Sequence, residues 1–229
     1  MTSVADRDLN RRPGQNPPGI GPIAGALWFL ALATVYGAAL AAALRGAAPS
    51  GGFAVWAPIL SRACTVAFFV IQATLMITRK ATVARREGLA PWTVSLLGTY
   101  GVWVMAFLPE VRLSPALSVV SAAISLGGCL LILWSILHLG RSFSIAPQAR
   151  ALVTSGPYRF VRNPLYLAEE IALIGVAMHV DWRVATCFLV AHLAMQISRM
   201  RYEEDLLGSV FPEYAAYAGR TARWIPGVW

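Results

Sequence analysis

Four long stretches without Asp, Glu, Lys or Arg constrain the fold of this chain more than any other feature. Residues 22–44, 91–108 and 113–140 contain none of these side chains, and residues 53–78 contain only Arg62. A helix needs about 20 consecutive apolar residues to cross the hydrocarbon core of a bilayer. Each stretch is close to or above that length, so each predicts a transmembrane helix.

Two shorter apolar segments, 165–180 and 184–198, are separated by only three residues and predict a tight helical hairpin. The sequence therefore predicts an all-α, polytopic integral-membrane helical bundle of about six transmembrane helices, of which the last two form a short hairpin. We divide it into a flexible, Pro- and Gly-rich tail (1–20), four transmembrane helices (21–139) and a polar C-terminal region (140–229).

Composition excludes two other classes of protein. Hydrophobic residues make up 57% of the chain and charged residues 13%. A soluble domain carries about 25% charged residues, so the chain does not have the composition of a soluble globular protein. It is not a disordered protein either, because disorder requires low hydrophobicity and high charge. The net charge of +8 comes from too few charged residues to suggest a nucleic-acid groove, and no nucleic-acid partner is expected.

The positive charges are distributed unequally between the two sides of the expected membrane. Cytoplasmic loops of membrane proteins are enriched in Lys and Arg. The N-terminal tail, the second and fourth loops and the C-terminal tail together carry 15 of the 19 basic residues. We therefore expect both termini, and the polar C-terminal region, to face the cytoplasm from an inner (plasma) membrane. The opposite loops carry only three basic residues: Arg45, Arg112 and Arg183.

The three cysteines, Cys64, Cys129 and Cys187, all lie in apolar runs and form no C-x-x-C pair. The three histidines are scattered. Metal sites need His, Cys or carboxylate ligands at close spacings, so the sequence predicts neither a metal site nor a disulfide framework.

The polar C-terminal region begins with a loop that leads into the hairpin. Ser155-Gly156-Pro157 has the composition of a turn. Pro164 suits the first position of a helix, where its missing N–H is not needed, and Asn163 before it is a suitable N-cap. Helix capping alone explains Asn163 and Pro164, but not the polar residues around them.

Polar side chains recur on both expected hairpin helices. Tyr166 lies three residues before Glu169 and four before Glu170, so it shares a helix face with each. Because carboxylates facing lipid are costly, we expect one glutamate to face a cavity and the other the headgroups, without deciding which. On the second helix, spacings of 4, 3 and 4 align His192, Gln196, Arg199 and Glu203 in one stripe that predicts an interior face. Interhelical hydrogen bonding is an equally good explanation for its first two members.

Several motifs in this region resemble one family of enzymes. They are Thr154-Ser155-Gly156-Pro157-Tyr158-Arg159, Arg162-Asn163-Pro164-Leu165-Tyr166, Glu203-Glu204-x-x-Leu207, Phe211-x-Glu213-Tyr214-x-x-Tyr217 and Ile225-Pro226. Their order over about the last 90 residues resembles the isoprenylcysteine carboxyl methyltransferase family, and is similar to the related phospholipid N-methyltransferases.

This resemblance implies an integral-membrane methyltransferase that uses S-adenosyl-L-methionine without a Rossmann domain, and places catalysis on Arg199 and Glu203. It implies that Arg199 faces a lipophilic substrate that enters from the bilayer, and from their place on the helix we expect Glu169 and Glu170 to contact the same substrate. The implied cofactor-binding residues are Gln148, Leu152, Val153, Tyr158, Asn163, Pro164, Leu165, Tyr166 and Glu203.

The chain departs from the family's usual pattern at Asn163, where the family usually has His before the proline. Asn can hydrogen-bond but cannot act as a base. A carboxylate acceptor is ionised at pH 7 and needs no base, whereas an amine acceptor needs one, for which Glu169 or Glu170 is the candidate.

We favour carboxylate O-methylation of a prenylated substrate. Phospholipid N-methylation, a transporter and a non-catalytic membrane protein on the same scaffold remain alternatives.

Overall fold

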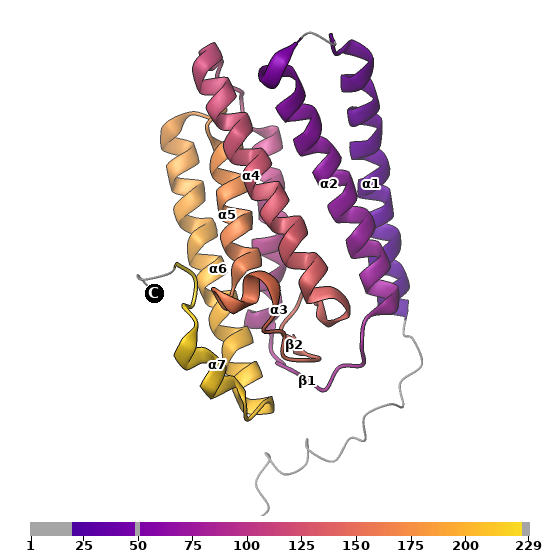
Figure 1. Cartoon of the computed structure of the whole chain (residues 1–229), viewed down its shortest axis with the longest axis vertical. Coiled ribbons are helices and arrows are strands. Elements are labelled where there is room, and N and C mark those ends of the chain that lie inside the picture. The colour runs from indigo at the N-terminus through magenta and orange to yellow at the C-terminus, as the bar shows by residue number, and fades with distance from the viewer. Residues whose placement is uncertain (1–19, 49–50, 226–229) are drawn as a thin grey trace, which may run out of the picture.

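The computed structural model describes residues 20–48 and 51–225, and the tail predicted for residues 1–20 lies almost entirely outside them. The described residues are mostly helical (Figure 1), with two short strands. The helices are α1 (Ile20–Gly46), α2 (Gly52–Thr78), α3 (Leu89–Tyr100), α4 (Pro115–Leu139), α5 (Pro164–Ala177), α6 (Trp182–Val210) and α7 (Tyr214–Arg220), and the strands are β1 (Ala84–Arg85) and β2 (Gln148–Ala149).

Three of these helices are long and apolar enough to cross a membrane: α1, α2 and α4. The other expected spans are helical but do not reach this standard. α3 has 12 residues before the chain tightens into a 3₁₀ helix over Gly101–Phe107, and α5 has 14. α6 has 29 residues and continues to Val210. The sequence prediction ended this helix at residue 198 because the residues that follow are polar and no longer belong to an apolar run. The hairpin thus forms with unequal arms, and the predicted count of six spans is not confirmed.

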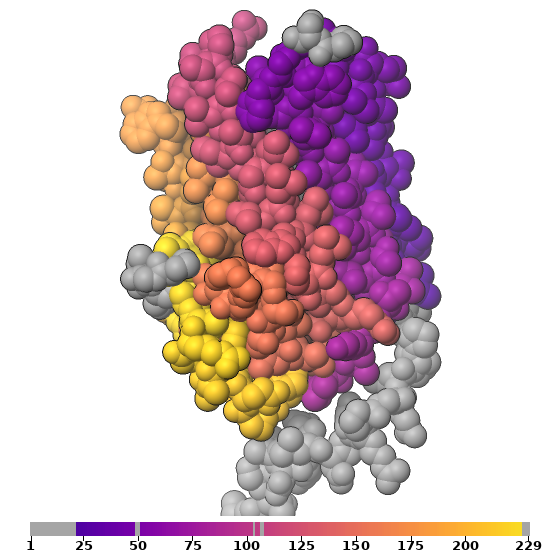
Figure 2. Space-filling model, viewed as in Figure 1, coloured from indigo at the N-terminus to yellow at the C-terminus, as the bar shows by residue number. Residues whose placement is uncertain are grey.

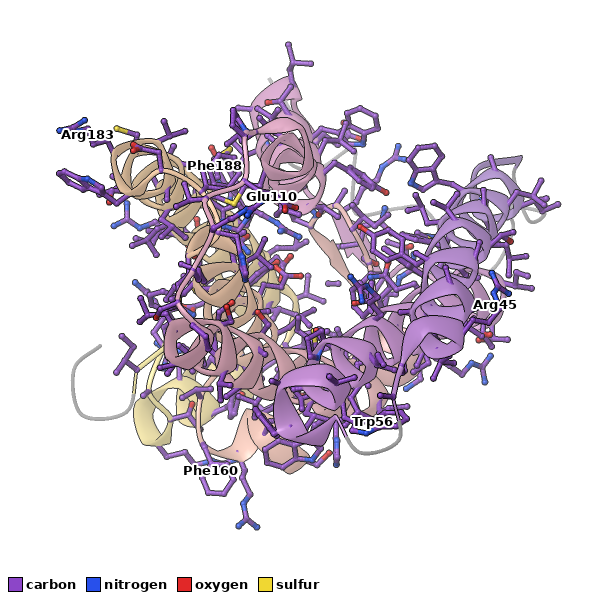
Figure 3. The ribbon with its side chains drawn as sticks, turned by 90° about the horizontal axis from the view of Figure 1, so that it is seen from above. Arg45, Trp56, Glu110, Phe160, Arg183 and Phe188 are labelled. Atoms are coloured by element: carbon purple, nitrogen blue, oxygen red, sulfur yellow. The ribbon has the colours of Figure 1, made fainter. Side chains whose placement is uncertain are left out.

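The helices are not arranged in chain order. α2 packs against α1 and α4, α4 against α5, α5 against α6, and α6 against α3. Seen from above (Figure 3), they surround a central region filled with side chains, while Phe160 and Arg183 point outward. This order places α3 and the polar stripe of α6 side by side, although they are far apart in sequence.

Small residues let α4 and α5 approach closely. Ser121 of α4 donates a hydrogen bond of 2.8 Å to the backbone oxygen of Gly175 on α5. A Cβ placed on Gly175 would lie 2.2 Å from Ser125 Oγ, and one on Gly128 would lie 2.3 Å from the backbone nitrogen of Ala172. Close backbone approach through small residues is a common source of helix association in membranes. It holds α5, which carries part of the site, against a candidate spanning helix.

We expect Gly175→Ala to destabilise the protein by about 1–3 kcal/mol, because the added methyl group overlaps α4 backbone as well as a side chain. The measurement is the free energy of unfolding in mixed micelles. Gly127→Ala is the matched control, because a Cβ there meets nothing within 4 Å. Equal stability of the two variants would contradict close packing at Gly175.

The loops between residues 79 and 88 and between 140 and 163 gather at one end of the bundle, where they meet the C-terminal segment (Figures 1 and 2). β1 and β2 pair antiparallel there, with Ala84 opposite Ala149. Arg150 fastens the two loops by donating to Ser144 Oγ at 2.8 Å and to the backbone oxygen of Lys80. Burial lowers the pKa of Arg150 to about 10, so the side chain stays charged at neutral pH.

Candidate active site

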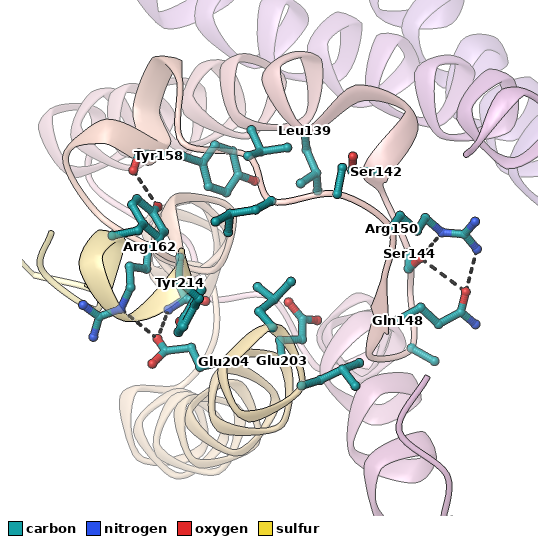
Figure 4. A pocket seen from close by; sticks show the side chains of 18 residues that line it. Leu139, Ser142, Ser144, Gln148, Arg150, Tyr158, Arg162, Glu203, Glu204 and Tyr214 are labelled. Carbon is teal, nitrogen blue, oxygen red and sulfur yellow. Dashed lines mark hydrogen bonds and ion pairs between the residues drawn. The ribbon is translucent and has the colours of Figure 1, made fainter. Parts of the chain in front are cut away.

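A pocket opens at this end of the bundle, with an empty volume of about 650 Å³ that includes solvent at its mouth. Its walls come from the loop around β2, the start of the hairpin, the last turns of α6, and α7 (Figure 4). We refer to it as the loop pocket. Six of the residues implied to bind the cofactor line it: Gln148, Leu152, Val153, Tyr158, Asn163 and Glu203.

Two tyrosines of α7 complete the loop pocket. The hydroxyl of Tyr217 donates a 2.6 Å hydrogen bond to the backbone oxygen of Tyr158, which ties α7 to the loop. Burial raises the pKa of Tyr158 above its ordinary value and that of Tyr217 to about 12, so both hydroxyls keep their protons. The buried hydroxyl of Tyr214 has no hydrogen-bond partner among the described residues. A polar ligand in the loop pocket would supply one.

Gln148 is restricted by its neighbours. Its Oε1 accepts hydrogen bonds from Arg150 Nη2 at 2.6 Å and from Thr82 at 3.2 Å. The oxygen is therefore already engaged, and only the amide N–H groups of Gln148 remain to contact a ligand.

A second cavity, with an empty volume of about 460 Å³ that also includes open solvent, lies between α2, α3, α5 and α6. We refer to it as the helix cavity. Its apolar wall includes Phe143, Ile145 and Leu165, and its charged residues are Glu169, Arg199 and Glu203. An apolar wall beside a few charged groups suits a lipophilic molecule with a polar head.

The two cavities share part of their walls. Ser144, Asn163 and Glu203 line both. Glu203 points into the space enclosed by the loop pocket, while Glu204 turns away toward Arg162 (Figure 4). Tyr166 donates a hydrogen bond from its hydroxyl to Glu203 Oε1 from the side of the helix cavity. Tyr166 and Glu203 therefore meet at the boundary between the cavities, whereas Tyr158 lines the loop pocket alone.

The polar stripe of α6 faces the interior, as predicted, and three of its four members are buried. His192 contacts Glu170 Oε1 at 2.6 Å and the backbone oxygen of Gly98 at 3.0 Å. Gln196 donates to Glu169 Oε2 at 2.6 Å. These contacts join α3, α5 and α6, so His192 and Gln196 act as interhelical hydrogen-bonding residues.

Arg199 is held from several sides. Its Nη1 donates to Gln196 Oε1 at 2.8 Å and lies 3.8 Å from Glu169 Oε2, and its guanidinium stacks 4.7 Å from the centre of the Tyr166 ring. On α3, a Cβ at Gly98 would lie 2.8 Å from the Cδ of Arg199. A glycine at this position thus leaves room for the arginine. Arg199 Nε, which is buried, has no hydrogen-bond partner among the described residues.

Asn163 contributes to a polar cluster next to the loop pocket. Its Nδ2 donates to Glu204 Oε1 at 2.7 Å and to the backbone oxygen of Arg223 at 3.0 Å. Glu204 also pairs with Arg223 at 3.0 Å and with Arg162 at 3.4 Å. Asn163 occupies the predicted N-cap position of α5, with Pro164 after it, but its side chain makes no cap hydrogen bond. Its side chain fastens the hairpin to the C-terminal segment instead.

Residues 116–214 match the phospholipid methyltransferase family model. The chain is also similar to two curated proteins, over 96 residues in each case. It is 36% identical to the cobalt-zinc-cadmium resistance protein CzcN of Cupriavidus metallidurans and 34% identical to the nickel-cobalt-cadmium resistance protein NccN of Alcaligenes xylosoxydans xylosoxydans. Each alignment covers 41% of this chain and 42% of the relative.

The phospholipid methyltransferase match runs from α4 to the first residue of α7. It therefore includes most of the loop pocket and excludes α1, α2 and α3. Together with three apolar helices of spanning length, it supports a membrane protein. The names of the two relatives concern metal resistance, but no group of three or more potential metal ligands occurs within residues 20–48 and 51–225.

Two of the residues implied by the resemblance lie apart from both cavities. Pro164 begins α5 but lines neither, and Glu170 is buried against His192. The expectation that one glutamate would face the headgroups is thus wrong, because Glu170 pairs inside the bundle while Glu169 lines the helix cavity.

Two residues that line the cavities, Tyr214 and Gln72, were not predicted from the sequence. Tyr214 stands in a motif quoted for the resemblance, and Gln72 is the lone amide in the second apolar stretch.

Proposed function

We propose that the protein is an integral-membrane methyltransferase that uses S-adenosyl-L-methionine to methylate a lipophilic acceptor. The observation that carries the proposal is the pair of adjoining cavities, one at the loop end and one between the helices, with Glu203 in the wall of both. Methyl transfer needs two ligands whose reacting atoms meet, and a common wall provides a place for that meeting.

The residues of the loop pocket fit the cofactor. Glu203 can accept hydrogen bonds from hydroxyl or ammonium groups, the unpartnered hydroxyl of Tyr214 can donate or accept one, and Gln148 can donate from its amide. Leu152 and Val153 provide apolar contact for the adenine ring of the cofactor. When bound, S-adenosyl-L-methionine supplies a methyl group on a positively charged sulfur atom, which is reactive without a metal.

In the helix cavity, we propose that Arg199 binds a carboxylate acceptor through its unpartnered Nε, with prenyl carbons against Phe143, Ile145 and Leu165. Because a carboxylate is ionised at neutral pH, O-methylation requires no base. This is consistent with Asn163 being engaged in structural hydrogen bonds.

N-methylation of a phospholipid amine is the second candidate, and one observation favours it. Glu169 lines the same cavity and accepts a hydrogen bond from Gln196 at one carboxylate oxygen, so its other oxygen can accept a proton from an amine. For both candidates, we place the protein in the inner (plasma) membrane with the loop pocket facing the cytoplasm, because the positive loops lie at that end.

The test uses the full chain in nanodiscs made with lipids of its host. We expect S-adenosylhomocysteine to bind, as measured by isothermal titration calorimetry, and radiolabelled methyl groups to pass into the lipid or protein fraction. Label released as methanol by mild alkali identifies a methyl ester, whereas label that resists alkali identifies N-methylation. A protein that neither binds S-adenosylhomocysteine nor transfers label would refute the proposal and leave the non-catalytic alternative.

A further inference from the structure

The backbone of α3 at Gly98 lies against the polar stripe of α6. Gly98 is buried, and α3 packs against α6. The phospholipid methyltransferase match begins at residue 116, beyond the end of α3. The match therefore assigns no role to α3, and what this helix contributes to the site follows from its contacts with α6.

The first contact is a hydrogen bond that fixes α3 on α6. The backbone oxygen of Gly98 lies 3.0 Å from His192 Nε2. Because a carbonyl oxygen can only accept a hydrogen bond, Nε2 carries a hydrogen atom. The other ring nitrogen, Nδ1, lies 2.6 Å from Glu170 Oε1. Both ring nitrogens are thus engaged, and the imidazole joins α3, α5 and α6 about two turns before Arg199.

The second contact is the space that the missing side chain of Gly98 leaves. A Cβ there would lie 2.8 Å from Cδ and 3.2 Å from Nη1 of Arg199, and 3.2 Å from Gln196 Oε1. Two of these atoms, Nη1 and Oε1, form the hydrogen bond between Arg199 and Gln196. Arg199 is 4% exposed and stacks on Tyr166, so it has little room to move aside. Its position therefore depends on the absence of a side chain at residue 98.

We propose that Gly98 is a positioning residue that sets the place of the Arg199 guanidinium. Its backbone oxygen holds α3 against α6, and its lack of a side chain leaves the space that the arginine fills. Gly98 lines neither cavity, so it acts on the reaction through Arg199 and not by contact with a ligand. The inference rests on the proposed function, in which Arg199 binds the acceptor, and goes beyond it by giving α3 a part in the reaction.

The test is Gly98→Ala in the full chain in nanodiscs. We expect methyl transfer per S-adenosylhomocysteine binding site to fall by about 10- to 100-fold, because a displaced guanidinium no longer orients the acceptor. Affinity for S-adenosylhomocysteine should stay within about twofold of the wild type. Counting the binding sites by isothermal titration calorimetry corrects for misfolded protein. Gly101→Ala is the matched control and should keep wild-type activity, because a Cβ there meets nothing within 4 Å.

A double-substitution cycle separates positioning from a general structural role. Arg199→Lys removes the guanidinium that Gly98→Ala is expected to displace. We therefore expect Gly98→Ala to lower the activity of the Arg199→Lys variant by less than about threefold, since residues that act through one another are not additive. Equal fold losses in the two backgrounds would overturn the inference, as would wild-type activity of Gly98→Ala.

If Gly98→Ala does not yield folded protein, the double variant Gly98→Ala/Arg199→Ala decides the question. It lacks the arginine atoms that the added methyl group would meet, so it should be as stable to heat as Arg199→Ala alone. A double variant that still fails to fold would overturn the inference. A wild-type protein that neither binds S-adenosylhomocysteine nor transfers label would instead reject the proposed function itself, so the two failures are distinguishable.

Discussion

Replacing Glu203 by Gln is expected to weaken the binding of S-adenosylhomocysteine by about 10- to 100-fold. The carboxylate can accept hydrogen bonds on both oxygens, whereas an amide replaces one acceptor by a donor that would face the ligand's own hydroxyl or ammonium hydrogens. Tyr166 can still donate to the remaining oxygen, so the boundary between the cavities should stay intact. The measurement is isothermal titration calorimetry on the full chain in nanodiscs.

Asp205→Asn is the matched control for this substitution. Asp205 lies on the same helix and is exposed, and its contact is an ion pair with Arg86 at 3.1 Å. Asp205 does not line either cavity. The affinity of the Asp205→Asn variant for S-adenosylhomocysteine should therefore equal that of the wild type. If Glu203→Gln and Asp205→Asn bound equally well, Glu203 would have no part in cofactor binding.

Replacing Arg199 by Lys is expected to lower methyl transfer by about 100-fold or more while leaving S-adenosylhomocysteine affinity within about twofold. Lysine keeps the charge but loses the planar fork of donors and the stacking on Tyr166. A carboxylate acceptor would then lack the directed N–H that orients its oxygen, and correct orientation contributes much of the rate in such a reaction. The assay is transfer of labelled methyl groups to the fraction that the wild type labels.

Arg201→Lys serves as the control, because Arg201 lies two residues further along α6 and is exposed. We expect it to retain wild-type activity. Activity of Arg199→Lys within a few fold of the wild type would show that positive charge alone is sufficient at this position. The proposed recognition of a carboxylate through the directed Nε–H of Arg199 would then be wrong.

The parts of the fold that sequence analysis predicted are those determined by local composition. Long apolar runs predict α1, α2 and α4 because a bilayer requires them, and the 4-3-4 spacing predicts the buried stripe on α6 because helical periodicity alone determines its face. The length of α6 could not be predicted in this way. Past Ser198 the helix leaves the apolar region, and its continuation to Val210 depends on packing with α7 and the loops.

The candidate site was predicted less completely, because its geometry depends on contacts between distant segments. The different partners of Glu169 and Glu170 are an example of this dependence on distant segments. Both carboxylates lie one turn into the same helix, and only the position of α6 places His192 beside Glu170 and Gln196 beside Glu169. Gln72 is separated from Arg199 by more than a hundred residues, and nothing in a single sequence indicates that the two line one cavity.

The buried carboxylate of Glu204 has a consequence for how the loop pocket exchanges its contents. It joins Arg162 and Asn163 at the start of the hairpin to Arg223 near the end of the described chain. Pulling either segment away would strand a charge in a water-poor environment, which is far more costly than separating an exposed pair. The start of the hairpin and the segment around Arg223 should therefore move together whenever the loop pocket takes up or releases a ligand.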